Sequence, residues 1–306
     1  MENRPPTRLK SISEFHISRC LPPPEHPMIS VVDFGKVPRS ANIGNNSWVF
    51  DFYQISLKKG IDFKMKYGQQ QYDFDDGVMA FIAPNQVFKI DHEINPTQKR
   101  SGWMLLIHPD FLWNTQLAKK IKDYDYFDYS INEALFLSEK EEKTVNGIIE
   151  NVRQEYSANI DKFSKHIIIS QIETLLGYSE RFYNRQFITR EKSNHQILRS
   201  LEELLNNSFQ NDDLATKRLL TVQDIAQQLN ISQKYLSTLL KVLTGLSTQQ
   251  HIHNKLIEKA KQKLSTTDLS ISEIAYDLGF EYSQSFSKLF KSKTSQSPSE
   301  FRSSFS

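Results

Sequence analysis

The chain has 306 residues, of which 38% are hydrophobic, and this is enough for two domains that each bury a core of their own. Its single cysteine excludes an intramolecular disulfide framework and is compatible with a reducing compartment. The formal net charge of +2 is unevenly distributed: residues 214–306 carry 12 Lys/Arg against 7 Asp/Glu, a charge of +5, so the remainder carries −3. A basic C-terminal third favours a polyanionic partner, although surface lysines that only keep a helical domain soluble would give the same excess.

The sequence indicates neither a membrane span nor a secretory signal. No apolar run approaches the ~20 residues that a transmembrane helix needs, and the N-terminal residues MENRPPTRLK lack a hydrophobic signal core. We therefore expect a cytoplasmic protein without a membrane partner. Residues 1–27 end in the proline-rich stretch LPPPEHP, and because proline disfavours helix they are predicted to be an extended arm. The arm is either a passive leader or a segment that makes a regulatory contact.

From residue 28 to about residue 109, apolar residues recur at a period near two, which is typical of half-buried strands. In the first predicted strand Trp48, Phe50 and Phe52 alternate with Val49, Asp51 and Tyr53. Strands are predicted at residues 48–53, 63–67, 78–83, 88–92 and 103–107, with turn-forming residues between them. Several short strands at this spacing favour an antiparallel sandwich or a small barrel.

A metal-dependent enzyme on such a barrel would need clustered ligands, for example two histidines and a carboxylate from adjacent strands. Only His92 and His108 fall in the predicted barrel, between residue 28 and about residue 109, and no H-x-H pair lies there. His251 and His253 form such a pair, but on a predicted helix, where positions i and i+2 point apart. The chain also lacks a nucleophile elbow, a P-loop and a dinucleotide fingerprint. We therefore expect no enzyme activity, no metal site and no cofactor.

The barrel's aromatic side chains either fill its core or line a pocket for a small apolar or ring-shaped ligand. The candidate ligand-binding residues are Trp48, Phe50, Phe63, Tyr67, Phe81, Phe88 and Trp103.

After residue 111 the hydrophobic period changes to 3.6. The capping box SEKE at residues 138–141 begins a helix predicted to reach about residue 156, and a second helix is predicted over residues 161–183. The apolar stripe of the second helix is wider than one contact surface needs, so it packs on the barrel alone or on the barrel and a second copy of the chain. Residues 186–194, QFITREKSN, are predicted to be a linker, which gives domains at residues 28–185 and 195–306.

Residues 221–302 contain two copies of one supersecondary unit. The copies are TVQDIAQQLNISQKYLSTLLK from Thr221 and SISEIAYDLGFEYSQSFSKLFK from Ser270. Each copy predicts a short helix, a turn and a second helix, which is a helix-turn-helix. The turn needs a residue that tolerates positive φ, and Asn230 and Gly279 supply it. Ser232 is a suitable N-cap for the second helix of the first copy.

These residues carry a specific resemblance over about the last third of the chain. The segment resembles the DNA-binding domain of the AraC/XylS family of bacterial transcription regulators. The matching residues are I-A-x-x-L-N-I-S-x-x-Y-L-S at 225–237, T-G-x-S at 244–247, T-D-L-S-I-S-E-I-A-Y-D-L-G-F at 267–280, F-S-K-L-F-K at 286–291 and S-P-S-E-F-R at 297–302.

The resemblance implies a multidomain α and β protein, in which an antiparallel cupin-like jelly-roll barrel with a helical layer precedes an all-α DNA-binding domain with two helix-turn-helix units. It implies a sequence-specific transcription regulator controlled by a small-molecule signal at the barrel. The expected partners are double-stranded DNA, the effector, a second copy of the chain in a homodimer and, as a further candidate, RNA polymerase.

Outward-facing positions of the two second helices are the candidate DNA contacts. Lysine can donate to guanine and glutamine can pair with adenine, so base contacts are expected from this face; its residues are Lys234, Ser237, Thr238, Ser283, Gln284, Ser287 and Lys288. Lys241, Lys291 and Lys293 lie near the helix ends, where contacts to phosphates are expected.

Two other functions compete with a signal-controlled regulator. One is a constitutive DNA-binding protein whose barrel only dimerises. The other is a barrel enzyme fused to a DNA-binding module, against which the missing ligand cluster argues.

Overall fold

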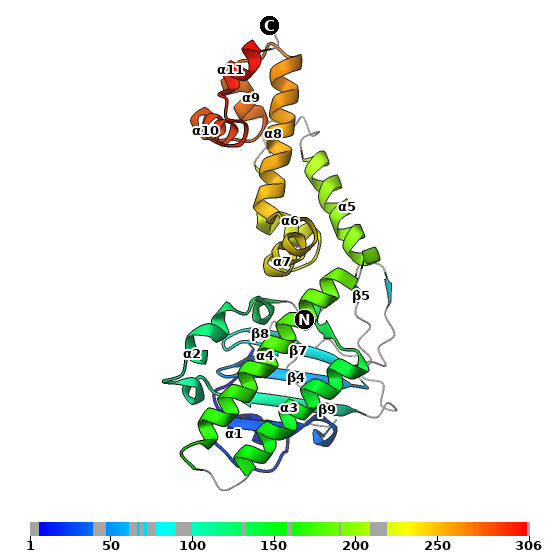
Figure 1. Cartoon of the computed structure of the whole chain (residues 1–306), viewed down its shortest axis with the longest axis vertical. Coiled ribbons are helices and arrows are strands. Elements are labelled where there is room, and N and C mark those ends of the chain that lie inside the picture. The colour runs from blue at the N-terminus through cyan, green and yellow to red at the C-terminus, as the bar shows by residue number, and fades with distance from the viewer. Residues whose placement is uncertain are drawn as a thin grey trace. The chain divides into compact units, whose positions relative to one another are not determined.

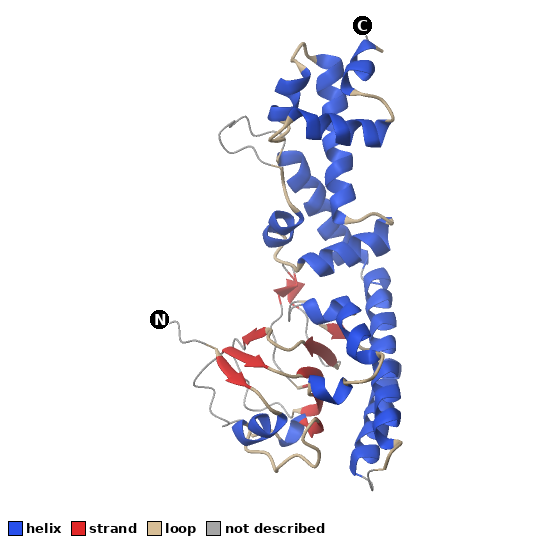
Figure 2. Cartoon of the chain, turned by 90° about the vertical axis from the view of Figure 1, so that its left-hand side faces the viewer, coloured by secondary structure: helices blue, strands red, loops and turns tan. Residues whose placement is uncertain are grey.

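The computed structural model describes residues 6–38, 47–60, 66–67, 70–71, 77–89, 100–129, 133–157, 161–189, 191–208 and 219–304. The chain divides into two compact units, Met1–Thr189 and Arg190–Ser306. Among these residues, strands occur only in the first unit, and the regular structure of the second is helical (Figure 2). An N-terminal sheet region and a C-terminal helical domain are therefore present, as predicted.

The first unit is built on a five-stranded antiparallel sheet with the strand order β10-β7-β4-β9-β2. Its strands are β2 (Ile29–Asp33), β4 (Tyr53–Lys59), β7 (Val78–Ile82), β9 (Ser101–Ile107) and β10 (Leu135–Phe136). A three-stranded sheet has the order β1-β3-β8, from β1 (Thr7–Leu9), β3 (Ser47–Phe50) and β8 (Val87–Lys89), with β1 parallel to β3. A short hairpin joins β5 (Lys66–Tyr67) to β6 (Gln70–Gln71).

The strands predicted at residues 78–83 and 103–107 are confirmed as β7 and β9. Those predicted at 63–67 and 88–92 lie mostly outside the described residues. The connections from β2 to β3 and from β8 to β9, which join strands of different sheets, include residues 39–46 and 90–99, and these are outside the described residues, so the cupin-like jelly-roll barrel stays a prediction.

The two faces of the five-stranded sheet have different neighbours. Strand register places Phe81 beside Ile55 on one face, and the Phe81 ring lies 6.1 Å from that of Tyr183 in the long helix α4. Figure 1 shows α3 (Glu139–Ser157) and α4 (Ser164–Thr189) side by side across this sheet, which is the predicted helical layer. Between β9 and β10 lie short helical turns: η2 (Pro109–Leu112), α2 (Leu117–Lys120), η3 (Ile121–Asp123) and η4 (Asp125–Asp128).

The opposite face of that sheet packs on the three-stranded sheet. Gln54 lies between Leu106 and Ile82 in the register of this face. Leu106 and Ile82 belong to a buried cluster with Trp48 and Phe50 of β3, and with Phe15 of α1. The core of the first unit thus has two layers, one under the helices and one between the sheets.

The prediction of an extended arm over residues 1–27 is wrong for residues 7–18. β1 pairs with β3, and α1 (Ile12–Ser18) buries Ile12 and Phe15 between the sheets. Ser11 caps α1 by accepting a hydrogen bond from the backbone N–H of Glu14. The prolines lie before and after α1 rather than within it, so they limit the helix without preventing it.

The single strand predicted over residues 48–53 is also wrong. β3 ends at Phe50 and β4 begins at Tyr53, and the two strands belong to different sheets. Asp51 fixes the bend, because its backbone N–H bonds to Leu9 O at 3.0 Å and its carboxylate pairs with Arg8 at 2.6 Å. Burial on both sides of the bend explains why Val49, at 8% exposure, does not face solvent as alternation predicts.

Helix α4 continues through the predicted linker to Thr189, and α5 (Glu191–Asn207) begins two residues later. A polar, aperiodic sequence remains helical here because tertiary contacts hold it. Phe187 is 1% exposed, and the Gln186 amide accepts from Phe136 N at 2.9 Å and donates to Ala134 O at 3.3 Å. The side chain of Gln186 thereby binds the edge strand β10.

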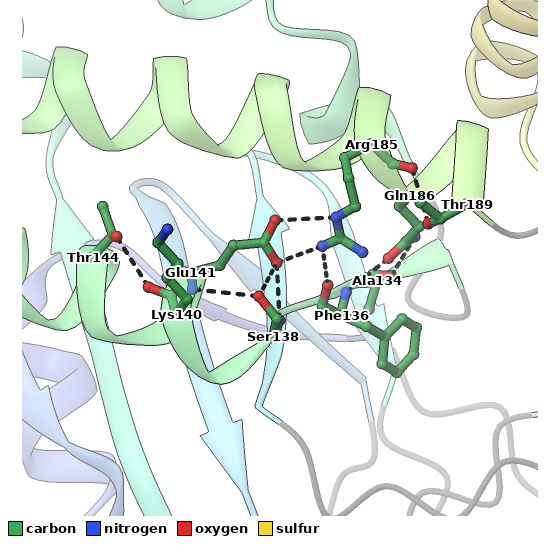
Figure 3. Close-up of polar contacts among 9 residues, drawn as sticks. All are labelled: Ala134, Phe136, Ser138, Lys140, Glu141, Thr144, Arg185, Gln186 and Thr189. Atoms are coloured by element: carbon green, nitrogen blue, oxygen red, sulfur yellow. Dashed lines mark hydrogen bonds and ion pairs between the residues drawn. The ribbon is translucent and has the colours of Figure 1, made fainter.

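The last turns of α4 are also tied to the start of α3 (Figure 3). Arg185 donates from Nε to Glu141 Oε1 at 3.0 Å, and from Nη2 to Glu141 Oε2 and to Phe136 O, both at 2.7 Å. Glu141 is the fourth residue of the predicted capping box, which is confirmed: Ser138 N donates to Glu141 Oε2 at 2.9 Å. One carboxylate therefore caps α3 and anchors α4.

We expect Arg185→Met to lower the free energy of unfolding of the first unit by about 1–3 kcal/mol, because it leaves Glu141 and Phe136 O without their donor in a partly buried site. Urea unfolding followed by tryptophan fluorescence measures this, since Trp48, Trp103 and Trp113 all lie in the first unit and are the only tryptophans. Arg153→Met is the control: Arg153 and Glu150 are 41% and 51% exposed, so about 0.5 kcal/mol or less is expected. Equal effects of both substitutions would contradict the anchoring role.

Candidate nucleic-acid interface

The first helix-turn-helix is formed by α6 (Val222–Gln228) and α7 (Gln233–Thr244). The Thr221 hydroxyl accepts from the backbone N–H of Asp224, whose carboxylate accepts from the Thr221 backbone, so α6 begins with a capping box. Asn230 turns the chain with a φ of 56°, and Ser232 caps α7 through the Tyr235 N–H. The predicted turn residue and the predicted N-cap are confirmed.

The second helix-turn-helix repeats these devices in α9 (Ile271–Asp277) and α10 (Ser283–Thr294). Ser270 and Glu273 form the capping box of α9, and Gly279 turns the chain with a φ of 85°. The copies differ at the next cap: Tyr282 stands at the N-cap of α10 and makes no side-chain capping bond.

Both second helices also end in the same way. Gly245 and Ser295 adopt left-handed conformations with φ of 73° and 63°. Their N–H groups donate to Lys241 O at 3.0 Å and to Lys291 O at 2.9 Å. Each capped end leads directly into a third helix.

The third helices are α8 (Thr248–Thr266) and α11 (Pro298–Ser303), and each begins with a capping box, Ser247–Gln250 or Ser297–Glu300. The repeated unit therefore has three helices, whereas comparison of the sequence copies identified two. The spacing of the two S-x-x-[QE] motifs, equal to that of the two left-handed caps, was a signal that could have revealed the third.

A single core joins the two copies through α8. Figure 1 shows α6 and α7 at one end of α8 and α9, α10 and α11 at the other. Lys263 of α8 also pairs with Asp277 of α9 at 2.5 Å. The buried residues of this core include Leu201, Ile225, Leu236, Leu240, Ile252, Leu256, Ala260, Leu264, Ile274, Phe286 and Phe290. Because α8 is common to both halves, the spacing of α7 and α10 is fixed by packing.

The predicted inner faces of α7 and α10 are confirmed in large part. Leu236, Leu239 and Leu240 are fully buried, as are Phe286 and Phe290, while Leu289 is only partly buried. Tyr235, 1% exposed, is a core residue that the sequence analysis did not identify.

The predicted DNA-contact residues fall into two groups by exposure. The longer polar and basic side chains are exposed, namely Lys234, Lys241, Gln284, Lys288, Lys291 and Lys293. The hydroxyl residues Ser237, Thr238, Ser283 and Ser287 are half-buried. Ser237 Oγ lies 3.1 Å from Thr248 Oγ1, and Ser287 Oγ donates to Ser283 O at 3.0 Å. These two serines are therefore already hydrogen-bonded within the domain.

Two exposed tyrosines near α10 were missed. Tyr276 is 55% and Tyr282 is 63% exposed, and Tyr282 directly precedes α10. Large exposed aromatic residues beside a basic helix suit contact with a partner.

The pKa of His253 in α8 is lowered, first by burial and then by the positive charge of Lys293, so its ring is neutral at pH 7.

The His251-x-His253 pair makes separate contacts, as predicted. His251 Nε2 lies 2.9 Å from Thr244 Oγ1, and His253 Nε2 lies 2.8 Å from Gln249 Nε2. Within the described ranges, no group of three or more His, Cys, Asp or Glu residues is placed to hold a metal ion. Nor does any helix in the part of the chain that is described have the length and apolar character to span a membrane.

The candidate ligand-binding aromatics do not form one cluster. Phe81 and Trp103 lie under the helices, where Phe81 packs on Tyr126 and Trp103 Nε1 donates to Asn146 Oδ1 at 2.8 Å. Trp48 and Phe50 lie between the two sheets. Phe63 is outside the described residues, and the side chains of Tyr67 and Phe88 are outside them as well.

Comparison with known proteins bears on the helical unit. Residues 225–304 match the family described as a helix-turn-helix domain. The chain is 33% identical over 144 residues to the uncharacterized HTH-type transcriptional regulator YfiF of Bacillus subtilis, over 47% of this chain and 42% of that protein. It is 40% identical over 84 residues to the raffinose operon transcriptional regulatory protein RafR of Pediococcus pentosaceus, over 28% of this chain and 30% of that protein. Residues 225–304 are therefore an AraC-type helix-turn-helix domain.

A solved structure, the C-terminal domain of the response regulator AraT from Geobacillus stearothermophilus, is 31% identical with a TM-score of 0.31 and covers 35% of this chain and 84% of that one. The chain spans less than half the length of the two curated relatives named above. The family match lies within the second unit.

In this AraC-type domain we expect Gly279→Ala to reduce the free energy of unfolding by about 1–2 kcal/mol, because a side chain at positive φ is strained. Asn230→Gly is the matched substitution in the other turn and should change stability by only a few tenths of a kcal/mol, since glycine tolerates the same φ. Urea unfolding of the full chain followed by far-UV circular dichroism measures both. Tryptophan fluorescence of the same samples, which reports on the first unit, should not change. A loss at Asn230→Gly as large as at Gly279→Ala would refute the φ argument.

Proposed function

We propose that the chain is a sequence-specific transcription regulator whose α7 and α10 enter two successive major-groove segments of double-stranded DNA. The observation that carries this proposal is the repetition of one capped three-helix unit around the shared helix α8. A short helix and a turn that present a second, partly basic helix suit the major groove. The relatives named as transcriptional regulators support the same function.

The length of α8 supports a fixed spacing of the two recognition helices. Its 19 residues span about 28 Å at 1.5 Å per residue. With the width of the flanking helices, α7 and α10 lie on the order of one DNA turn, about 34 Å, apart. α8 has no internal Gly or Pro, so it acts as a rigid spacer.

We assign roles to the candidate contacts from their exposure and from their position along α7 and α10. Lys234 and Gln284 are exposed in the first turns of α7 and α10, and Lys288 is exposed in the second turn of α10, so we assign all three to base contacts. Lys241, Lys291 and Lys293 lie at or near the last turns and are assigned to phosphates. Ser237, Thr238, Ser283 and Ser287 complete the face; the hydrogen bonds of Ser237 and Ser287 suit them to orienting it.

The first unit is proposed to form a homodimer and to receive a small-molecule signal. Phe163 and Ile167, at the start of α4, are 57% and 41% exposed, whereas the stripe from Ile168 to Tyr183 is largely buried. These apolar side chains suit a second copy of the chain. A ligand that favours one arrangement of this unit would change how the AraC-type domains are presented to DNA or to RNA polymerase in the cytoplasm. If the first unit binds no ligand and only dimerises, the chain is instead a constitutive DNA-binding regulator.

Selection of bound sequences from a random pool of double-stranded DNA by the full chain tests the function. We expect a site with two boxes about one turn apart, and an affinity that falls steeply with salt, because lysines displace counterions. If the folded protein enriched no sequence at low salt, the proposed function would be wrong.

We predict that Lys234→Ala and Lys288→Ala each weaken specific binding by about 1–3 kcal/mol and relax base preference in different boxes of the site. Lys143→Ala in α3, an exposed lysine of the first unit, removes the same charge outside the DNA-binding domain and should have little effect. Gel-shift titrations against the selected site and against single-base variants measure both properties. A uniform loss over all sequences would reassign the lysine concerned to a phosphate.

The rigid spacer makes a second prediction about the DNA. Inserting about 5 base pairs between the boxes moves one box to the opposite face and should abolish specific binding. Inserting about 10 base pairs restores the face but not the distance, so binding should stay lost because α8 cannot lengthen. A gel-shift series with the three spacings measures this. Recovery of specific binding at the longer insertion would mean that the two helix-turn-helix units are joined flexibly.

A further inference from the structure

The layer between the two sheets of the first unit contains polar side chains that a purely structural core would not need. β4 places Gln54, Ser56 and Lys58 on the face that is turned toward the three-stranded sheet, since Gln54 pairs in register with Leu106 and Ser56 with Met104 of the inter-sheet cluster. Gln54 is 3% exposed and Ser56 is fully buried. On the opposite, helix-covered face the same strand carries Tyr53, Ile55 and Leu57 instead.

Two buried polar atoms of this layer have no hydrogen-bond partner among the described residues: Ser56 Oγ and Trp48 Nε1. Trp48 is 6% exposed. A buried donor or acceptor that is left unpaired costs about 1–3 kcal/mol, so native proteins rarely keep one without a reason. Indole N–H is a donor only and therefore calls for an acceptor.

Positive charge converges on the same place. Arg19, which follows α1, lies with Cζ 4.6 Å from the centre of the Trp48 ring and 5.7 Å from that of Phe15. Lys58 Nζ and Arg100 Cζ lie over one ring, that of Phe34, at 5.2 and 5.5 Å. Burial lowers the pKa of Lys58 to about 8, and the charges of Arg19 and Arg100 add to the shift.

The acidic groups of this region that the structure describes are engaged with other residues. Asp51 pairs with Arg8 at 2.6 Å, and Glu142 pairs with Lys59 at 2.7 Å. Asp33 accepts from the Gly35 N–H at 2.9 Å. Lys58 and Arg100 make further interactions of their own, so a ligand would meet the summed charge of the cluster rather than unpaired groups.

We propose that the layer between the sheets binds an organic carboxylate, with its charge held by Arg19, Lys58 and the Trp48 N–H and its apolar body packed on the Phe34 and Trp48 rings. The proposal rests on the proposed function in one respect, namely that the first unit receives a small-molecule signal, and it names the chemical class of that signal. A carboxylate fits better than a neutral ligand because the Trp48 N–H and all three cations are donors. An apolar body fits because the cluster around them is aromatic and aliphatic.

The test measures binding of defined probes to the full chain by calorimetry and by the thermal shift of tryptophan fluorescence. Benzoate and hexanoate serve as aromatic and aliphatic carboxylates, benzamide and hexanamide as their neutral counterparts, and inorganic phosphate as a small anion. At least one carboxylate should bind and raise the melting temperature of the first unit, because a ligand that binds only the folded state stabilises it. The matching amide should not.

Variants locate the site. Arg19→Met should weaken carboxylate binding about tenfold or more, the loss expected for one charge-assisted hydrogen bond. Trp48→Phe keeps an aromatic ring and removes only the N–H, and should weaken binding less. Lys36→Met is the matched control, because Lys36 is 79% exposed and its partner, Asp33, is not one of the ligand-holding residues. Far-UV circular dichroism shows whether each variant is folded.

Four outcomes would overturn the proposal: amides that bind as tightly as carboxylates, phosphate that binds as tightly, a folded Arg19→Met that binds unchanged, or no carboxylate binding at millimolar concentration. Gel shifts with the selected DNA separate it from the proposed function. If a carboxylate binds at Arg19 but DNA affinity does not change, the site stands and its regulatory role fails. If neither ligand nor DNA binds, both are wrong.

Discussion

The packing of one helix, α8, against both helix-turn-helix units is the constraint on which the C-terminal half depends. Neither α6 and α7 nor α9 and α10 are large enough to bury a core alone, so each pair completes its core on α8. Large-to-small substitution in such a core typically costs about 2–5 kcal/mol. A substitution at the middle of α8 would therefore destabilise both helix-turn-helix units at once. Shared burial thus stabilises the domain and sets the distance between α7 and α10 in the same step.

The sequence predicted the AraC-type domain well because its determinants are local. Capping boxes, left-handed turn residues and helical apolar spacing act within a few residues, so Asn230, Gly279 and Ser232 could be assigned without knowledge of the fold. The same local signals could have revealed the third helix of each unit. The half-burial of Ser237 could not have been read from the sequence, because it depends on its hydrogen bond to Thr248 across the core.

In the first unit the predictions failed where tertiary contacts override local preference. The prolines around α1 suggested an arm, yet Ile12 and Phe15 are held between two sheets. The polar stretch at residues 186–194 suggested a linker, and the boundary between the two compact units falls within it, but contacts of Gln186 with β10 keep α4 helical to Thr189. The bend at Asp51 depends on Arg8, which is far away in sequence. The described candidate ligand-binding aromatics lie in two separate layers, because the alternation of residues along a strand does not say which neighbour covers each face of the sheet.

The two units differ in how they satisfy polar groups, and this difference has a physical meaning. In the AraC-type domain α6, α7, α8, α9 and α11 begin with a side-chain cap, and α10 does not, so most of these helix starts have backbone donors satisfied within the domain. The inter-sheet layer of the first unit pairs His16 with Ser30, but Ser56 Oγ and Trp48 Nε1 have no hydrogen-bond partner among the described residues, and Arg19 lies over the Trp48 ring. Apolar substitutions of these two side chains would remove that cost and so raise the free energy of unfolding. Buried polar groups that lower stability in this way are expected at binding sites, which is consistent with the proposed carboxylate site.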